Sequence, residues 1–354
     1  MELNIIKTDK PKEKPMDDSK LGFGRILTDH MFTMRYSEEK GWHDAVIEPY
    51  RDFTMSPAAL VLHYGQGIFE GLKAYKAEDG RMLLFRPEDN FKRMNASARR
   101  LCMPEFDADF VLSALKELIR LEADWIPTTR GTSLYIRPTM VALDPFIGVK
   151  AASEYLFYII LSPVGAYYPE GFKPVKIYVE DYYVRAVRGG LGEAKTMANY
   201  AASLLAGEEA HKKGFTQVLW LDAKDRKYIQ EVGSMNIFFK IDDVLITPPL
   251  DGAILPGITR ASVIQMAKDM GIRVAERDIS IDEVIEAQRE GRLDEAFGTG
   301  TAAVISPVGW IYFKDQEYEI NGGAMGALAE KLYDGLTAIQ YGDESDGFGW
   351  SQMI

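Results

Sequence analysis

A segment rich in proline, glycine and tyrosine divides this chain into two halves. It runs from Pro163 to Pro174 with the sequence P-V-G-A-Y-Y-P-E-G-F-K-P. Proline and glycine interrupt regular secondary structure, so this composition is typical of a linker. A chain of 354 residues is also long enough for two domains. We therefore predict a flexible N-terminal arm over 1–20, a small α/β domain over 21–165, a linker over 166–180 and a larger domain over 181–354.

Strand patterns and helix patterns are mixed on both sides of the linker. The runs that we predict as strands are Ile26–Tyr36, Ala59–Tyr64, Met82–Arg86, Ser133–Pro138, Tyr155–Ser162, Val175–Val184, Gln217–Asp222, Asn236–Ile241 and Glu295–Thr299. The runs that we predict as helices are Pro87–Leu101, Asp107–Ala123, Asn199–Lys213, Ile258–Met270, Ile281–Glu290 and Gly323–Gln340. Because the two kinds do not alternate strictly, the fold class is α+β or mixed α/β.

Composition and charge exclude several classes of partner. The net charge of −12 argues against nucleic acid or an anionic membrane as a main partner. No run approaches the roughly 20 apolar residues of a membrane span, and residues 1–20 lack the apolar stretch of a signal peptide. Cys102 is the only cysteine, which excludes an intramolecular disulfide. We expect a cytoplasmic protein that binds neither nucleic acid nor membrane.

A glycine-rich turn delivers one lysine, Lys195, to the start of a predicted helix. Residues 189–196 read G-G-L-G-E-A-K-T and differ from the nucleotide-binding pattern G-x-x-x-x-G-K-[ST] only at Ala194. The glycine missing there is one that the phosphate-cradling backbone needs. The other interpretation is a Schiff-base lysine, whose neutral amine adds to an aldehyde. The turn alone leaves both interpretations open.

Pyridoxal 5'-phosphate (PLP) is the usual aldehyde for such a lysine, and it makes three demands on a protein. Its phosphate needs backbone N–H groups, hydroxyls and an arginine, and Gly257-Ile258-Thr259 at a predicted helix start could supply the first two. The turn G-T-G-T-A-A (298–303) adds Thr301. The ring nitrogen needs a carboxylate, for which Glu231 is a candidate. The phenolic oxygen needs a donor such as Tyr200.

Taken together, seven stretches resemble the branched-chain amino acid aminotransferases, which are fold-type IV PLP enzymes. The stretches are Y-G-Q-G-I-F-E-G (64–71), S-L-Y-I-R-P (133–138), P-V-G-A-Y-Y (163–168), G-E-A-K-T-M-A-N-Y (192–200), E-V-G-S-M-N-I-F (231–238), L-P-G-I-T-R (255–260) and F-G-T-G-T-A-A (297–303). The resemblance runs from about Phe23 to the C-terminus. It implies two domains with the cofactor between them, and it makes 181–354 the PLP-binding domain.

The resemblance also implies roles for residues that bind the cofactor. Lys195 would hold PLP as a Schiff base and, once released, would shuttle the proton between the substrate Cα and the cofactor. Glu231 would face the ring nitrogen and Tyr200 the phenolic oxygen. The phosphate would be bound by the residues Arg93, Ile258, Thr259 and Thr301. No metal site is implied.

For the substrate, the resemblance implies an apolar pocket and groups that bind carboxylates. The aromatic residues of this pocket would be Phe23, Tyr64, Phe69, Tyr135 and Tyr167. The carboxylates would meet Arg137, Ser234, Thr301, Ala302 and Ala303. We assign Arg137 to the γ-carboxylate of glutamate. Ile147 and Val149 would reach into the site of a neighbouring subunit, which implies a homodimer.

Two departures from the family and three further alternatives accompany this interpretation. Met197-Ala198 stands where many relatives have a glycine pair, which changes packing behind the cofactor. Ala303 and Ser306 occupy the positions of the vertebrate C-x-x-C, so thiol regulation is not expected there. D-amino acid aminotransferases and aminodeoxychorismate lyases share the fold, and a PLP-binding module without activity is the third alternative. The order of preference among leucine, isoleucine and valine does not follow from the sequence.

Overall fold

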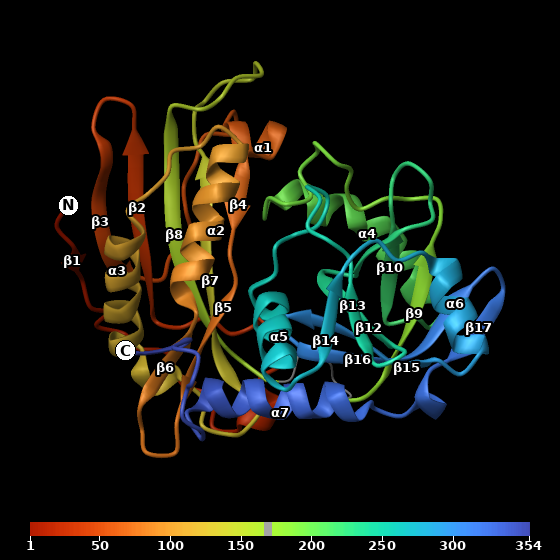
Figure 1. Ribbon diagram of the computed structural model, residues 1–354. Helices are drawn as coiled ribbons and strands as arrows, with labels where there is room; N and C mark the ends of the chain where they lie inside the picture. The colour runs from red at the N-terminus through yellow and green to blue at the C-terminus, as the bar shows by residue number, and fades with distance from the viewer. Residues whose placement is uncertain (166–171) are drawn as a thin grey trace. The chain divides into compact units, whose positions relative to one another are not determined.

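The computed structural model describes residues 1–165 and 172–354, and the chain forms two compact units (Figure 1). The first unit contains Met1–Pro169, Ala194–Met197 and Ala338–Ile354, and the second contains Glu170–Glu193 and Ala198–Thr337. The sequence-based boundaries differ from this division at several places. They include Val175–Glu180 in the linker, whereas these residues form a strand of the second unit. The boundaries also assign both Lys195 and the last residues of the chain to the larger domain, whereas contacts place these segments in the first unit.

The first unit is built on a sheet that, among the described residues, has nine strands. The strand order is β1-β3-β2-β8-β7-β5-β6-β18, with β4 paired to β7. The pairs are antiparallel except for β1 with β3. The strands are β1 (Asn4–Ile5), β2 (His30–Ser37), β3 (Gly41–Pro49), β4 (Gly67–Phe69), β5 (Leu72–Lys76), β6 (Met82–Phe85), β7 (Ser133–Ala142), β8 (Glu154–Val164) and β18 (Ser351–Met353).

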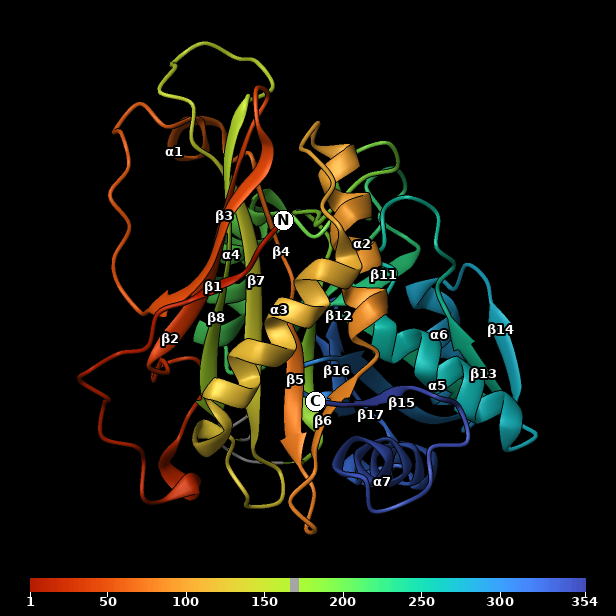
Figure 2. The ribbon, with the colours of Figure 1, turned by 90° about the vertical axis from the view of Figure 1, so that its left-hand side faces the viewer.

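Two helices pack on one face of this sheet (Figure 2). Helix α2 (Pro87–Arg100) begins with proline, has acidic residues in its first turn and ends with two arginines. Helix α3 (Ala108–Leu121) is capped by Asp107, whose carboxylate accepts hydrogen bonds from two backbone N–H groups. Proline and carboxylates at the N-terminus and basic residues at the C-terminus are the expected signals for a helix. Short 3₁₀ turns are η1 (Asp18–Lys20) and η2 (Ala123–Trp125).

One sequence prediction in this unit is wrong. The run Ala59–Tyr64 was predicted as a strand, but Leu60–Tyr64 forms the short helix α1. A brief apolar run carries no period that separates a strand from a helix. Leu60 is buried here, whereas Leu62 and Tyr64 are exposed, so only one side of the turn contacts the core.

The N-terminal arm has ordered contacts at several points, including an ion pair of Lys14 with Asp124 and hydrogen bonds from Thr128 and Thr129 to the Asp18 carboxylate. Strand β1 pairs with β3, so it extends the edge of the sheet. The backbone N–H of Thr8 donates to Nε2 of His30 at 2.8 Å, and that of Lys12 donates to Asp29 at 2.7 Å. These bonds show where the arm contacts the first unit.

The second unit is built on another sheet, in which six strands close into a ring. The order is β11-β10-β9-β16-β15-β12-β13-β14, β17 pairs with β16, and a pairing between β11 and β12 completes the ring. The strands are β9 (Val175–Glu180), β10 (Gln217–Leu221), β11 (Ile229–Val232), β12 (Met235–Ile241), β13 (Val244–Thr247), β14 (Arg273–Glu276), β15 (Leu293–Gly300), β16 (Val304–Phe313) and β17 (Gln316–Glu319). The closed ring places β11, β12 and β15 next to one another.

The helices that contribute to the second unit follow the predicted pattern with small changes at their ends. They are α4 (Met197–Lys212), α5 (Ile258–Asp269), α6 (Ile281–Arg289) and α7 (Ala327–Tyr341), while the 3₁₀ turn η3 covers Asn321–Gly323. Ser280 caps α6 by accepting the N–H of Glu283. Helix α7 begins at Ala327 rather than at Gly323 because the glycine-containing η3 turn precedes it. Strand β9 ends at Glu180, whose carboxylate accepts the N–H groups of Tyr182 and Tyr183.

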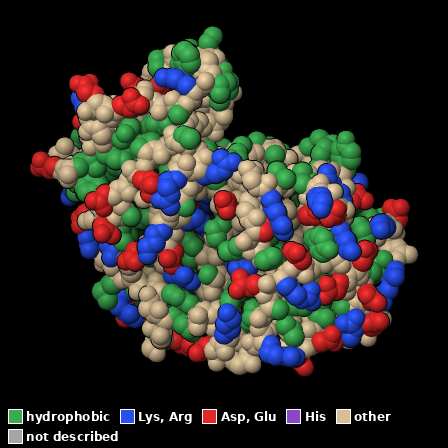
Figure 3. Space-filling model, turned by 45° about the horizontal axis from the view of Figure 1, so that its top comes forward, with side chains coloured by type: hydrophobic (Ala, Val, Ile, Leu, Met, Phe, Trp, Pro, Cys, Tyr) green, Lys and Arg blue, Asp and Glu red, His purple; other side chains and the backbone are tan. Residues whose placement is uncertain are grey.

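Charged side chains of both signs are interspersed over the face of the molecule drawn in Figure 3. On the face in Figure 3, acidic and basic groups alternate within short distances, and neither sign forms an extended field. Among the described residues, no helix combines the length and the apolar character that crossing a membrane requires.

Candidate active site

The glycine turn before Lys195 is held by contacts that only glycine allows. A Cβ atom on Gly192 would lie 2.1 Å from the carbonyl oxygen of Ala253, which is closer than any side chain can approach. Gly189 has a φ of +76°, which L-residues with side chains seldom adopt. The backbone of this turn therefore lies directly against the segment that contains Ala253.

Lys195 itself is fixed by backbone contacts within the first unit. Its N–H donates to the Ser97 hydroxyl at 2.9 Å, and its carbonyl accepts the N–H of Phe69 at 3.1 Å. The next residue, Thr196, forms a bridge with Ile68. The lysine side chain extends over the ring of Phe69, with Nζ 5.2 Å from the ring centroid. The amine is thus placed over an aromatic face by a backbone that α2 and β4 hold in position.

Arg93, the predicted phosphate ligand, forms a buried ion pair with Glu70. Nε of Arg93 lies 2.7 Å from one oxygen of Glu70 and Nη2 lies 2.8 Å from the other. Asn90 donates to the same carboxylate at 2.8 Å and to the carbonyl of Gly71 at 3.2 Å. Burial alone would raise the pKa of Glu70, but Arg93 and the charge of Lys195 hold that pKa below its ordinary value. Glu70 is therefore an anion that fixes the guanidinium.

Three of the predicted pocket aromatics and Arg137 form one cluster in the first unit. The rings of Phe23 and Tyr135 meet edge to face with centroids 4.9 Å apart. The guanidinium of Arg137 lies 4.8 Å from the centroid of Phe69 and 5.2 Å from that of Tyr135, and it donates to the Tyr135 hydroxyl at 3.0 Å. Gly71 leaves room for this hydroxyl, because a Cβ there would lie 2.1 Å from it.

The remaining substrate candidates of the first unit lie elsewhere or outside the described residues. The hydroxyl of Tyr64 donates to the carbonyl of Ile147, so this tyrosine contacts the loop after β7. Ile147 and Val149 are 71% and 85% exposed, so both apolar side chains face solvent in the single chain. Tyr167 belongs to 166–171, which the structure does not describe.

In the second unit, Glu231 is buried and held by two partners. Nε of Arg185 lies 2.5 Å from Oε2 of Glu231, and both side chains are over nine-tenths buried. Asn236 donates to Oε1 at 3.0 Å and to the carbonyl of Leu255 at 3.0 Å. Glu231 and Asn236 are also cross-strand neighbours, so their side chains share one face of the sheet.

Groups that could bind an anion adjoin this carboxylate. Helix α5 begins after Gly257 with no side-chain cap, which leaves its first N–H groups available. A Cβ on Gly257 would lie 1.9 Å from Oδ1 of Asn236, so the helix start lies against Asn236. Thr299 pairs with Asn236 across the sheet, and its buried hydroxyl has no hydrogen-bond partner among the described residues.

The other candidates of the second unit occupy nearby turns. Thr259 is buried and Ile258 half-buried at the start of α5. Ser234 lies in the turn between β11 and β12, and Thr301, Ala302 and Ala303 form the turn between β15 and β16. Tyr200 is half-buried in the first turn of α4.

Comparison with known proteins identifies the family. The model of the class IV aminotransferases matches residues 67–311. The chain is 56% identical to branched-chain-amino-acid aminotransferase 2 of Bacillus subtilis (strain 168), over 99% of this chain and 96% of the relative. This chain is a branched-chain amino acid aminotransferase of class IV. The enzymes of this family depend on PLP.

Solved structures of aminotransferases share the fold. The branched-chain amino acid aminotransferase of Escherichia coli superposes with a TM-score of 0.76 at 28% identity, covering 92% of this chain and 98% of that one. The enzyme from Thermobaculum terrenum, solved in its PLP form, superposes with a TM-score of 0.73 at 26% identity, covering 92% and 98%. The mixed α/β prediction and the fold-type IV resemblance are thereby confirmed.

The groups in the second unit of this aminotransferase fit PLP chemically. A buried carboxylate suits a protonated ring nitrogen, and uncapped helix N–H groups suit a phosphate. The buried Thr299 hydroxyl, which no described residue hydrogen-bonds, is another polar group at the same place. Among residues 1–165 and 172–354, no group of three or more potential ligands could hold a metal ion.

Four residues in these clusters were missed from the sequence: Glu70, Lys73, Arg185 and Asn236. Glu70 carried a signal, because it lies inside the motif F-E-G, and Asn236 lies inside E-V-G-S-M-N. Lys73 is buried on β5 opposite Tyr135, and burial lowers its pKa to about 8. Arg185 carried no sequence signal, since its partners are distant along the chain.

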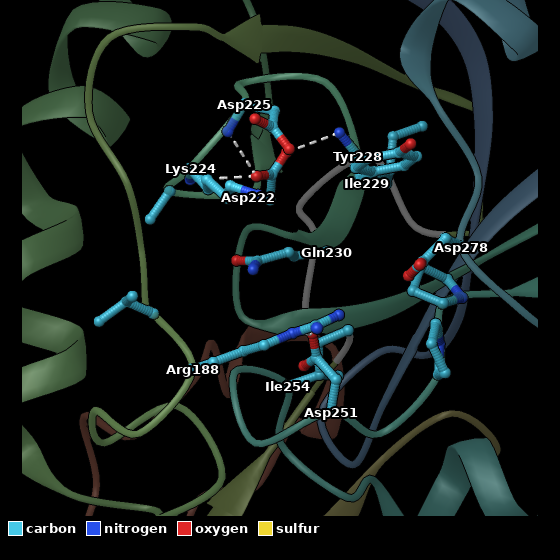
Figure 4. A pocket seen from close by; sticks show the side chains of 14 residues that line it. Arg188, Asp222, Lys224, Asp225, Tyr228, Ile229, Gln230, Asp251, Ile254 and Asp278 are labelled. Atoms are coloured by element: carbon cyan, nitrogen blue, oxygen red, sulfur yellow. Dashed lines mark hydrogen bonds and ion pairs between the residues drawn. The ribbon is translucent and has the colours of Figure 1, made fainter.

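A cavity of about 370 Å³ lies on another part of the second unit (Figure 4). Gln230 points into it from β11, with Asp222 on one side and the pair of Arg188 and Asp251 on the other. Successive side chains of a strand point to opposite faces, so Glu231 points away from this cavity. The cavity is therefore separate from the Glu231 cluster.

Proposed function

We propose that this aminotransferase moves the amino group of L-leucine, L-isoleucine or L-valine to 2-oxoglutarate, giving branched-chain 2-oxo acids and L-glutamate. The observation that carries the proposal is the position of Phe69. One ring lies against both the Lys195 amine and the Arg137 guanidinium. An apolar surface between a reactive amine and a carboxylate-binding cation suits an amino acid with an aliphatic side chain.

Lys195 carries the covalent and proton-transfer roles in this proposal. Bound PLP supplies an electron-withdrawing ring that stabilises negative charge at the substrate Cα. The Nζ atom of Lys195 would hold the cofactor between turnovers. As a free amine it would act as the base that moves the proton of the substrate Cα. The hydrogen bonds to Ser97 and Phe69 support this role because they fix the lysine backbone.

The other cofactor residues bind and orient. Glu231 would accept the hydrogen bond of the ring nitrogen, and Tyr200 would donate to the phenolic oxygen. The phosphate would be bound by Arg93, Ile258, Thr259 and Thr301. The burial of Glu231 and the uncapped start of α5 support these assignments.

The substrate residues provide an aromatic pocket and polar groups for carboxylates. The aromatic residues are Phe23, Tyr64, Phe69, Tyr135 and Tyr167. We assign Arg137 to the γ-carboxylate of glutamate, and the α-carboxylate to the residues Ser234, Thr301, Ala302 and Ala303. Arg137 supports this assignment because its guanidinium is held over two rings and has a donor to spare at Nε.

We also propose a homodimer in the cytoplasm. Ile147 and Val149 support the dimer, since exposed apolar side chains on a loop are suited to a protein contact. Each would enter the substrate pocket of the other subunit. The net charge of −12 supports the absence of nucleic acid and anionic membrane as partners.

A substrate profile tests the proposal. Purified holoenzyme with L-leucine and 2-oxoglutarate should form glutamate and 4-methyl-2-oxopentanoate, measured by chromatography. D-alanine and aminodeoxychorismate are the matched alternatives for the two related activities. Turnover of either one without turnover of leucine would reject the assigned substrate class and leave the family unchanged.

A further inference from the structure

Arg185 contacts three segments of the second unit with one side chain. Its Nε lies 2.5 Å from Glu231, Nη1 donates to the carbonyl of Ala253 at 3.0 Å, and Nη2 donates to that of Gly192 at 3.4 Å. The side chain is 7% exposed. All of these partners are acceptors, which matches the donor-only chemistry of a guanidinium.

Each of these segments leads to a group that we assign to the cofactor. Glu231 is the proposed partner of the ring nitrogen. Gly192 precedes Lys195 by three residues, in the turn that delivers the lysine. Ala253 precedes Gly257, the N-cap of α5, by four residues. The guanidinium is therefore bonded to three segments, each of which carries or adjoins a residue that we assign to the cofactor.

Close packing makes these segments depend on one another. Gly192 lies against Ala253 so tightly that no Cβ fits between them, and Gly257 lies equally close to Asn236. Asn236 in turn bonds Glu231 and the carbonyl of Leu255. A displacement of any one segment would thus break hydrogen bonds in the others.

We propose that Arg185 is a positioning residue that holds Glu231, the lysine turn and the start of α5 in their cofactor-binding arrangement before PLP binds. The inference rests on the cofactor roles proposed above for these segments. Pre-arranged partners bind a ligand more tightly because less order is lost on binding. Arg185 also supplies the positive charge that offsets the desolvation cost of the buried Glu231 carboxylate.

Arginine is required because a single ammonium group cannot reach these acceptors together. The guanidinium is planar and carries donors that point in fixed, different directions. Lysine would keep the charge beside Glu231 and lose the fork that reaches Gly192 and Ala253. Arg185→Lys therefore separates the effect of charge from the effect of geometry, whereas Arg185→Met removes both.

The test measures the PLP dissociation constant by titrating apoprotein, the melting temperature of the apoprotein, and kcat and KM at saturating PLP. We expect Arg185→Met to weaken PLP binding by about 10- to 100-fold, and Arg185→Lys to weaken it less. In a Glu231→Gln background, Arg185→Met should lower kcat much less than it does alone, because part of its effect passes through that carboxylate.

Glu295→Gln is the matched control for loss of fold stability. Glu295 is a buried carboxylate that caps α7 by accepting the N–H groups of Leu328 and Ala329. It should lower the melting temperature of the apoprotein and leave the PLP dissociation constant unchanged. If this control also weakens PLP binding, the measured loss reflects general destabilisation and the inference is overturned.

Other outcomes separate this inference from the proposed function. If Arg185→Met and Arg185→Lys lower the melting temperature but bind PLP as the wild type does, Arg185 is merely structural. If Glu231→Gln alone leaves both PLP binding and kcat unchanged, the proposed role of Glu231 fails instead. If Arg185→Met does not fold, weaker PLP binding by Arg185→Lys supports the inference and unchanged binding rejects it.

Discussion

Each compact unit contains a buried pair of arginine and glutamate, and these two pairs are built alike. Arg93 pairs with Glu70 in the first unit, and Arg185 pairs with Glu231 in the second. In each, an asparagine donates both to the carboxylate and to a backbone carbonyl. Buried ion pairs of this kind persist only where further hydrogen bonds complete them.

The pairs differ in how the arginine uses its donors. Arg93 contacts both oxygens of Glu70, so the carboxylate orients the guanidinium. Arg185 contacts Glu231 through Nε and directs its other nitrogens to backbone carbonyls. In the proposed function, the arginine is the working group of the first pair and the glutamate is that of the second. The supporting member has the opposite charge in the two units.

The largest expected effect comes from replacing Lys195. Both pairs act in the proposed reaction only together with this lysine. Lys195→Ala should abolish turnover, because it removes the covalent anchor and the proton carrier together. Borohydride treatment of the wild type should attach the cofactor to Lys195, as mass spectrometry of the digested protein would detect. Turnover that survives in Lys195→Ala would mean that neither pair serves a lysine-based reaction.

Replacing each glutamate by glutamine tests which member of each pair contacts the cofactor and which member only supports it. Glu231→Gln should lower kcat at saturating PLP by about 10²- to 10³-fold, because it removes charge stabilisation at the ring. Glu70→Gln should act mainly on stability and PLP affinity, since it leaves Arg93 buried without its counter-ion at a cost of about 3–5 kcal/mol. Steady-state kinetics and thermal melts of the two variants provide the comparison. The reverse pattern would exchange the assigned roles.

Lys73 is buried like the members of both pairs. Burial lowers the pKa of its amine to about 8. For a base whose folded pKa lies below its unfolded value, the unfolded chain binds more protons between the two values. Stability should therefore rise as the pH increases from about 8 to about 10.5, by up to roughly 3 kcal/mol. Denaturant unfolding of the wild type and Lys73→Met across this range measures it. An equal pH dependence in both proteins would assign the effect to other groups.

The smallest effects should come from the two asparagines. Asn90→Ala and Asn236→Ala each remove a donor shared by a carboxylate and a carbonyl, at about 1–3 kcal/mol of stability. We expect Asn236→Ala to weaken PLP binding as well, because Asn236 lies against the start of α5. Melting curves and PLP titrations of the two variants check both points. Equal PLP affinities would remove this distinction between the pairs.

Local sequence signals predicted most of the elements well. Proline and acidic residues at the start of α2, the Asp107 cap of α3 and Ser280 before α6 all act within one turn of their own position. The prediction failed at Leu60–Tyr64, where a short apolar run has no period and its burial depends on distant strands. The division of the chain also differs, because contacts made by Ala338–Ile354 are not visible in local composition.

The candidate site shows the same limit. Motifs singled out Lys195 and Glu231, whereas Arg93 was assigned only through the resemblance to the family. Of their supporting partners, Glu70 and Asn236 lie inside motifs, but no local pattern shows which residues they bond. Arg185 has no motif, and its three acceptors come from segments that only the closed ring of strands and its loops bring together.

The sequence by itself determined the mixed α/β class and the family, and it indicated candidate residues for the chemistry, since these depend on local patterns and on ordered motifs. Tertiary structure alone determined which charges are buried together and which glycines lie against a neighbouring backbone. Those features depend on contacts between residues far apart in the chain. The energy of a buried charge is set by the groups that surround it in space, and its neighbours in sequence need not be among them.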